Sequence, residues 1–222
     1  MKNNLTELIF VLDRSGSMEH LASETIGGFN SLIEKQKKET EGEVYVTTVL
    51  FDDKYELLHD HMNIHDIPRL TDKDYYARGC TALLDAVGRT IDRVGERLSK
   101  TAEDQRPSQI LFVITTDGYE NASVDYTKSK VKDMITLKQN TYSWKFLFLG
   151  ADIDAVSEAD SLGIRHSGVC RSSASGDGIK TSYQAVSHIA DYLRKSPSSS
   201  SKSKASEDAF ASECAVAFSR VK

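Results

Sequence analysis

The sequence predicts an α/β protein with a doubly wound, mostly parallel six-stranded sheet, one antiparallel edge strand and helices on both faces. Short apolar runs alternate with longer stretches of helical periodicity. Continuously apolar runs are typical of parallel strands that are covered on both faces. Only residues 52–54 separate the second and third runs, and a connection that short joins antiparallel strands. The 222 residues are few enough to share one hydrophobic core.

Strands and helices alternate along most of the predicted domain. Apolar runs rich in branched and aromatic residues predict strands over 5–12, 44–51, 55–61, 110–116, 144–149 and 164–169. Helices are predicted over 26–40, 82–102, 129–139, 154–162 and 181–194. The second helix carries one apolar stripe at three- and four-residue steps, formed by Leu83, Leu84, Val87, Ile91, Val94 and Leu98. This order predicts strand–helix–strand crossovers.

The composition changes at a serine-rich tract near the end of the chain. We expect residues 1–195 to form the domain and residues 196–204 to form a flexible linker, because the tract is too polar to fold alone. Residues 205–222 are expected to form a short amphipathic helix. Phe210, Cys214 and Phe218 lie at near-helical spacing in this segment, so the helix needs a surface that covers them.

Charge and cysteine content exclude several classes of protein. The net charge is −5 without a long basic stripe, which argues against a nucleic-acid or anionic-membrane partner. Every apolar run is much shorter than the roughly 18 residues of a membrane span, and no run has the pattern of a secretory signal. Three widely spaced cysteines are typical of reduced thiols. We therefore expect a cytoplasmic protein, of undetermined oligomeric state.

The first predicted strand ends in a cluster of oxygen-bearing side chains. Asp13, Ser15 and Ser17 lie within five residues, and Gly16 allows the chain to turn sharply between them. Open α/β sheets bind ligands at the carboxyl ends of their strands. Oxygen donors without thiol or imidazole suit a hard cation such as magnesium, manganese or calcium. The alternative is a structural Asx-turn cluster that starts a helix.

With two further segments, this cluster resembles the von Willebrand factor type A family. That family has a metal-ion-dependent adhesion site that opens with D-x-S-x-S after the first strand, as in Asp13-Arg14-Ser15-Gly16-Ser17. A distant threonine before a helix matches Thr81, and an aspartate after the central strand matches Asp117. The three parts occur in the expected order over roughly residues 5–195. The resemblance implies the Rossmann-like fold of that family.

The resemblance also implies a metal site and a kind of partner. Ser15, Ser17 and Thr81 would supply hydroxyl ligands, and Asp13 and Asp117 would bind the ion directly or through water. We expect Mg²⁺, with Mn²⁺ or Ca²⁺ as alternatives. Two carboxylates leave the ion able to attract a further anion, which in this family is an Asp or Glu of a partner protein. Residues that flank the ligands are expected to form the rim that contacts the partner: Arg14, Met18, Arg78, Tyr119, Glu120 and Asn121.

Enzymatic alternatives have weaker support in the sequence. A haloacid-dehalogenase-like phosphatase needs a second carboxylate two residues after the first, where this chain has Ser15. Serine-hydrolase elbows, phosphate-binding loops and dinucleotide fingerprints are absent. The function expected is therefore a non-catalytic, cation-dependent protein-binding module. The alternatives are a metal-assisted phosphohydrolase and an interaction domain whose ion only stabilises loops. A histidine group at 59, 61 and 65 is interpreted as an edge-strand feature.

Overall fold

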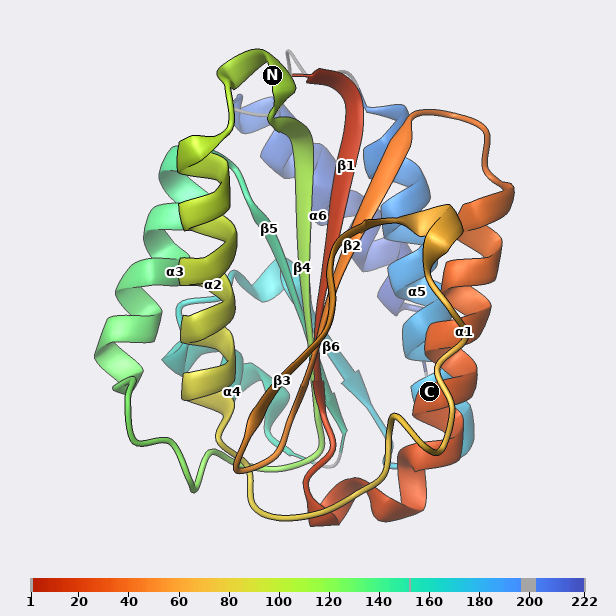
Figure 1. Cartoon of the computed structure of the whole chain (residues 1–222), viewed down its shortest axis with the longest axis vertical. Helices are drawn as coiled ribbons and strands as arrows, with labels where there is room; N and C mark the ends of the chain where they lie inside the picture. The colour runs from red at the N-terminus through yellow and green to blue at the C-terminus, as the bar shows by residue number, and fades with distance from the viewer. Residues whose placement is uncertain (1, 152, 197–202, 222) are drawn as a thin grey trace.

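A six-stranded sheet runs through the centre of the molecule (Figure 1). The computed structural model describes residues 2–151, 153–196 and 203–221. The strands lie in the order β3-β2-β1-β4-β5-β6. Their bounds are Lys2–Asp13 for β1, Glu43–Phe51 for β2, Tyr55–Asn63 for β3, Pro107–Thr116 for β4, Lys145–Ala151 for β5 and Val169–Ser172 for β6.

The strand directions confirm the predicted fold class. β2 pairs with β3 in antiparallel fashion, and every other pair in the sheet is parallel. From β1 the chain builds the sheet outward to β2 and β3 on one side, and then to β4, β5 and β6 on the other. The strand order therefore reverses between β1 and β4. Open α/β sheets place ligand sites at the carboxyl ends of such a pair.

Helices cover both faces of the sheet (Figure 1). One face packs against α1 (Ala22–Lys38), α5 (Gly176–Lys195) and α6 (Lys204–Phe218). The other face packs against α2 (Leu83–Lys100), α3 (Lys128–Tyr142) and α4 (Ala155–Ser161). Along β1, Leu8, Phe10 and Leu12 point to the first face, and Ile9 and Val11 point to the second. The continuous apolar run thus reflects burial on both sides.

The last strand differs from the prediction. We expected it over 164–169, but residues 166–168 form a 3₁₀ turn and β6 begins at Val169. Ile164 is buried against the α2–α4 side without entering the sheet. Gly168 passes so close to the Phe146 carbonyl that a Cβ atom would collide with it. The run is apolar because it is buried as a loop, and periodicity does not distinguish this case from a strand.

The last helix packs on its own domain. Phe210, Cys214 and Ala217 of α6 are buried in the same core as α1 and α5. Arg165 and Glu207 form an ion pair of 2.8 Å at its start. The helix begins at Lys204, inside the tract predicted as linker, and residues 197–202 of that tract lie outside the described residues.

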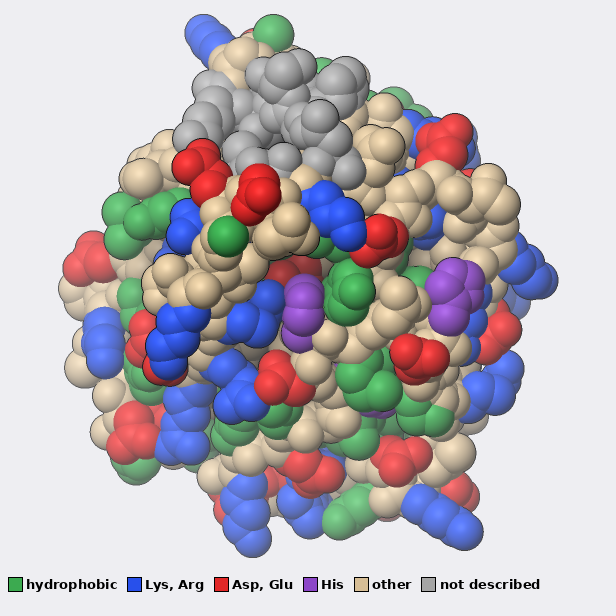
Figure 2. Space-filling view, turned by 45° about the horizontal axis from the view of Figure 1, so that its top comes forward, with side chains coloured by type: hydrophobic (Ala, Val, Ile, Leu, Met, Phe, Trp, Pro, Cys, Tyr) green, Lys and Arg blue, Asp and Glu red, His purple; other side chains and the backbone are tan. Residues whose placement is uncertain are grey.

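A view that brings the amino ends of the strands forward shows acidic and basic side chains interspersed over the visible face (Figure 2). Apolar side chains are scattered between the charged ones on this face. Among the described residues, none of the helices combines the length and the apolarity needed to cross a bilayer.

Candidate metal centre

The predicted ligands meet at the carboxyl ends of β1 and β4. Asp13 is the last residue of β1, and Asp117 directly follows β4, its neighbour in the sheet. Ser15 and Ser17 lie in the turn after β1, and Thr81 lies two residues before α2. Three segments that are far apart in the sequence therefore contribute oxygen atoms to one place.

Side-chain oxygens in this place lie within contact of one another. The Ser17 hydroxyl donates to Asp117 Oδ1 over 2.5 Å, and the hydroxyls of Ser15 and Ser17 are 3.2 Å apart. The Thr81 hydroxyl lies beside Gly118, on the same side as the Ser17 hydroxyl. A Cβ atom at Gly118 would lie 3.3 Å from Thr81 Oγ1 and 3.5 Å from Ser17 Oγ. A side chain at this position would crowd the hydroxyls, so the glycine keeps the space between the loops open.

Asp13 is fully buried beneath this group. Its carboxylate accepts hydrogen bonds from the Ser15 amide over 2.7 Å and from the Thr116 hydroxyl over 2.6 Å. Burial raises the pKa of Asp13 to about 6, the two hydrogen-bonding residues act in the opposite direction, and the nearby charge of Asp117 adds to the rise. A divalent cation beside these carboxylates would favour their charged forms.

Hydrogen bonds between the loops position the predicted ligands. The Gly16 amide donates to the Gly79 carbonyl over 3.1 Å, and Gly79 has a φ of +66°, which only glycine adopts without cost. Thr81 and Asn121 are joined twice: the Thr81 amide donates to Asn121 Oδ1 over 2.9 Å, and the Asn121 amide donates to the Thr81 carbonyl over 3.0 Å. Asn121, expected on the rim, therefore also positions a predicted ligand.

Two supporting residues were missed at the sequence level. Thr116 bonds the Asp13 carboxylate, and the hydroxyl of Tyr75 donates to the Asp13 carbonyl oxygen. Thr116 immediately precedes the predicted ligand Asp117, and this position in the sequence indicates a place at the site. Tyr75 lies 62 residues from Asp13 in a segment without regular structure, and nothing in the local sequence indicates its role.

The structure corrects the placement of two expected rim residues. Arg14 and Met18 are fully buried, so neither can contact a partner at the surface. The Arg14 side chain turns inward and bonds Asp52 over 2.9 Å. Met18 packs in the apolar core on the α1 side. Adjacent positions in a tight turn point in different directions, and these two point away from solvent.

The other rim residues divide into structural and exposed groups. Glu120 accepts hydrogen bonds from the amides of Leu84, Ala122 and Ser123, so its carboxylate closes the loop over the start of α2. Tyr119 is 54% exposed, although its hydroxyl accepts a hydrogen bond from the Asp154 amide. The Arg78 guanidinium lies 5.1 Å from the centre of the half-exposed Tyr76 ring and is partly exposed.

The donor set fits a hard divalent cation. Two carboxylates and three hydroxyls supply only oxygen atoms, which is the set that Mg²⁺, Mn²⁺ and Ca²⁺ prefer. The described residues contain no group of three or more His, Cys, Asp or Glu side chains that could hold a metal ion, and the oxygen cluster itself combines two carboxylates with hydroxyls. In the histidine group at 59, 61 and 65, His59 is buried in the sheet.

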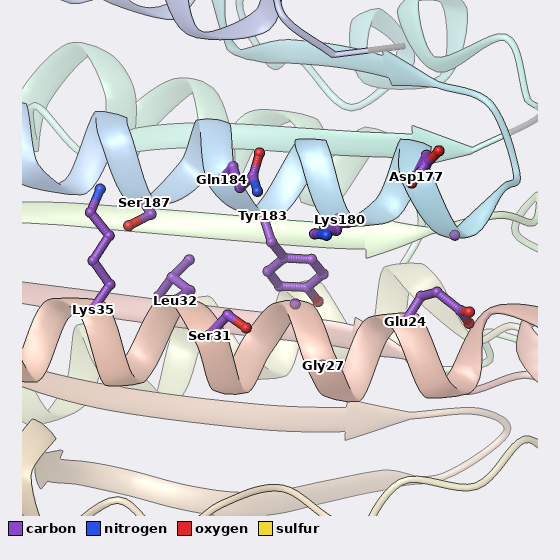
Figure 3. A pocket seen from close by; sticks show the side chains of 12 residues that line it. Glu24, Gly27, Ser31, Leu32, Lys35, Asp177, Lys180, Tyr183, Gln184 and Ser187 are labelled. Atoms are coloured by element: carbon purple, nitrogen blue, oxygen red, sulfur yellow. The ribbon is translucent and has the colours of Figure 1, made fainter.

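A separate cavity of about 590 Å³ lies between α1 and α5 (Figure 3). The ring of Tyr183 projects from α5 toward α1 across its middle. Lys35 and Ser187 mark one end, and Glu24 and Asp177 mark the other. None of the five predicted metal ligands lines it. The cavity is a groove between helices, distinct from the oxygen cluster.

No model of a known protein family matches the chain, and no curated protein matches it. Solved structures do match. Proximal thread matrix protein 1 from the mussel byssus is 17% identical with a TM-score of 0.61, over 85% of this chain and 46% of that one. A von Willebrand factor type A protein from Catenulispora acidiphila is 10% identical with a TM-score of 0.57, over 82% and 42%. The chain thus spans less than half the length of either protein.

A third structure matches over nearly its full length. The von Willebrand factor domain of the pilus tip protein Mfa5 from Porphyromonas gingivalis is 9% identical with a TM-score of 0.61, over 86% of this chain and 96% of that one. The mussel protein has also been solved with its metal-ion-dependent adhesion site occupied by zinc. Identities of 9–17% establish the architecture alone. On this evidence the chain has the fold of von Willebrand factor type A domains.

Proposed function

We propose that the protein is a divalent-cation-dependent binding module that captures an acidic residue of a partner protein. The observation that carries the proposal is the convergence of Asp13, Ser15, Ser17, Thr81 and Asp117 at the carboxyl ends of β1 and β4. This is the edge of the sheet where the strand order reverses and where open α/β folds bind ligands.

In this proposal the chain's own residues hold the cation and leave it electrophilic. Ser15, Ser17 and Thr81 contribute neutral oxygens, and Asp13 and Asp117 contribute the negative charge. A bound Mg²⁺, or alternatively Mn²⁺ or Ca²⁺, would supply an electrophilic centre that attracts a carboxylate. Tyr119 and Arg78 are partly exposed, and we assign these two rim residues to partner contact.

The proposal is of a non-catalytic protein. The two solvent-shielded oxygens of Asp13 are engaged by the Ser15 amide and the Thr116 hydroxyl, which suits a fixed charge rather than a nucleophile. A metal-assisted phosphohydrolase would hydrolyse a generic phosphomonoester in the presence of magnesium. Turnover that is lost in the Asp13→Ala variant would favour that alternative.

Cation binding is tested by titration calorimetry of the full chain with Mg²⁺ and Mn²⁺. The Asp13→Ala, Asp117→Ala double variant should lose binding because both negative ligands are removed. The matched control replaces two exposed aspartates outside the cluster, Asp104 and Asp133, by alanine. This control lowers the net negative charge equally and should bind like the original protein. Equal affinities in all three proteins would refute the metal site.

Partner capture is tested by affinity pull-down with and without a chelator. A captured protein should be released by chelator, should fail to bind the double variant, and should lose binding when one of its own acidic residues is replaced. Capture that persists in chelator would contradict the role of the cation. A cytoplasmic location is part of the proposal, supported by the unpaired state of Cys80, Cys170 and Cys214.

A further inference from the structure

One buried carboxylate, Asp52, joins the loops that carry the predicted ligands. Its Oδ2 atom accepts hydrogen bonds from Arg14 Nε over 2.9 Å and from Arg78 Nε over 2.7 Å. Its Oδ1 atom accepts from the Lys54 amide over 2.7 Å. The side chains of Asp52 and Arg14 are both fully buried. Asp52 lies directly after β2, in the turn before β3, and is not itself among the predicted ligands.

The two arginines extend this contact into a small network. Arg14 Nη2 donates to Glu56 Oε2 over 2.6 Å, and Arg14 Nη1 donates to the Asp74 carbonyl over 3.2 Å. Tyr76 lies beside both guanidinium groups, and its ring centre is 5.5 Å from Arg14 Cζ and 5.1 Å from Arg78 Cζ. Every polar end of the buried Arg14 therefore has a partner, so the side chain has one defined position.

Backbone hydrogen bonds connect this network to the ligand loops. Arg14 lies between Asp13 and Ser15, and its carbonyl accepts from the Arg78 amide over 2.8 Å. On the other side, the Asp52 carbonyl accepts from the Ala82 amide over 2.9 Å, one residue after Thr81. Asp52 thus contacts the chain immediately beside predicted ligands in two different loops.

A buried ion pair is weak evidence for stability, because removing the charges from water offsets much of their attraction. Its geometry, however, specifies the relative position of the groups that it joins. Burial acts to raise the pKa of Asp52, but hydrogen bonds from Arg78, the Lys54 amide and Arg14 outweigh it and lower the pKa. Asp52 is therefore charged in the folded protein at neutral pH.

We propose that Asp52 is a positioning residue for the cation site: through Arg14 and Arg78 it holds the 13–17 loop against the 78–82 loop, so that the hydroxyls of Ser15, Ser17 and Thr81 face one point. This inference rests on the proposed function for its consequence. The way in which the two loops fix each other can be measured without any cation.

The decisive comparison is Asp52→Asn with Glu7→Gln. Glu7 is also a fully buried carboxylate paired with an arginine, Arg97, but it lies in the middle of β1, six residues before Asp13. Both variants should lower the thermal midpoint. Removing residues that orient metal ligands lowers metal affinity about 10- to 100-fold. We expect such a loss of Mg²⁺ affinity by calorimetry in Asp52→Asn, and a dissociation constant within about twofold of the original protein in Glu7→Gln.

Amide hydrogen exchange of the metal-free proteins separates this inference from the proposed function. The Gly16 and Ala82 amides should exchange about tenfold faster or more in Asp52→Asn, because their inter-loop bonds open locally. They should be unchanged in Glu7→Gln. Arg78→Gln, which alters a partly exposed side chain, should show a smaller change in the same direction if Asp52→Asn does not fold.

Three outcomes would overturn parts of this account. Unchanged exchange at Gly16 and Ala82 in both Asp52→Asn and Arg78→Gln refutes the positioning role, whether or not a cation binds. Faster exchange with unchanged Mg²⁺ affinity refutes its consequence for the site. An original protein that binds no divalent cation refutes the proposed function, and in that case faster exchange in Asp52→Asn still supports the fixing of the loops.

Discussion

Phe210→Ala tests whether α6 is an integral part of the folded domain. Phe210 is only 6% exposed, and its ring centre lies 5.1 Å from Lys145 Nζ. An aromatic side chain buries roughly 150–250 Å², which at about 25 cal/mol per Å² corresponds to about 4–6 kcal/mol as an upper bound. Because α6 lies at the periphery and can shift to fill the space left by the ring, we expect a loss of about 3 kcal/mol in the free energy of unfolding. This corresponds to a fall of about 6–12 °C in the thermal midpoint.

Urea unfolding followed by circular dichroism measures this loss, and Val216→Ala is the matched control. Val216 lies on the same helix but is 46% exposed, so its truncation should cost less than about 0.5 kcal/mol. Mg²⁺ affinity should be unchanged in both variants, because all five predicted ligands lie outside α6. If Phe210→Ala costs no more than Val216→Ala, α6 is not packed as described.

Three further predictions concern the cation, acid stability and the end of α5. Mg²⁺ at about 100 times its dissociation constant should raise the free energy of unfolding by about 2.7 kcal/mol, and chelator should remove this gain in a thermal melt. Burial favours a higher pKa for Glu7, but His61 and Arg97 hold that pKa below its usual value. The free energy of unfolding should therefore fall as the pH drops below about 4.5, and it should fall less steeply in Glu7→Gln. Parallel acid-unfolding curves for the two proteins would contradict this. Arg194 donates to the carbonyls of Gln36 over 2.8 Å and Glu41 over 2.6 Å. Arg194→Met should therefore lower the free energy of unfolding in urea by about 2–3 kcal/mol. A loss below about 0.5 kcal/mol would refute the contact.

Most of the sheet could be predicted from local patterns. Burial on both faces imposes continuous apolar runs, and the three-residue link at 52–54 permits only an antiparallel pair, as β2 and β3 confirm. The prediction was wrong for the last strand, where the apolar run around Ile164 is a buried loop. Four residues of β6 pair with β5, too few to leave a distinct pattern.

The candidate site divides in the same way. Asp13, Ser15 and Ser17 are neighbours in the sequence, so their proximity follows from one turn. Thr81 and Asp117 were placed beside them by a family resemblance. The interpretation of Arg14 and Met18 as rim residues was wrong, because nothing nearby in the sequence indicates that either side chain turns inward.

The sequence by itself determined the alternation of strands and helices and the position of the oxygen donors in loops, because hydrophobic periodicity and turn chemistry are properties of neighbouring residues. Only the tertiary structure decided which loop residues face solvent and which hold the loops together. The direction of the Arg14 side chain depends on Asp52, which lies 38 residues away, and that of Tyr75 depends on Asp13, 62 residues away. Such contacts form when separate segments pack at one edge of the sheet, so a pattern of neighbouring residues does not predict them.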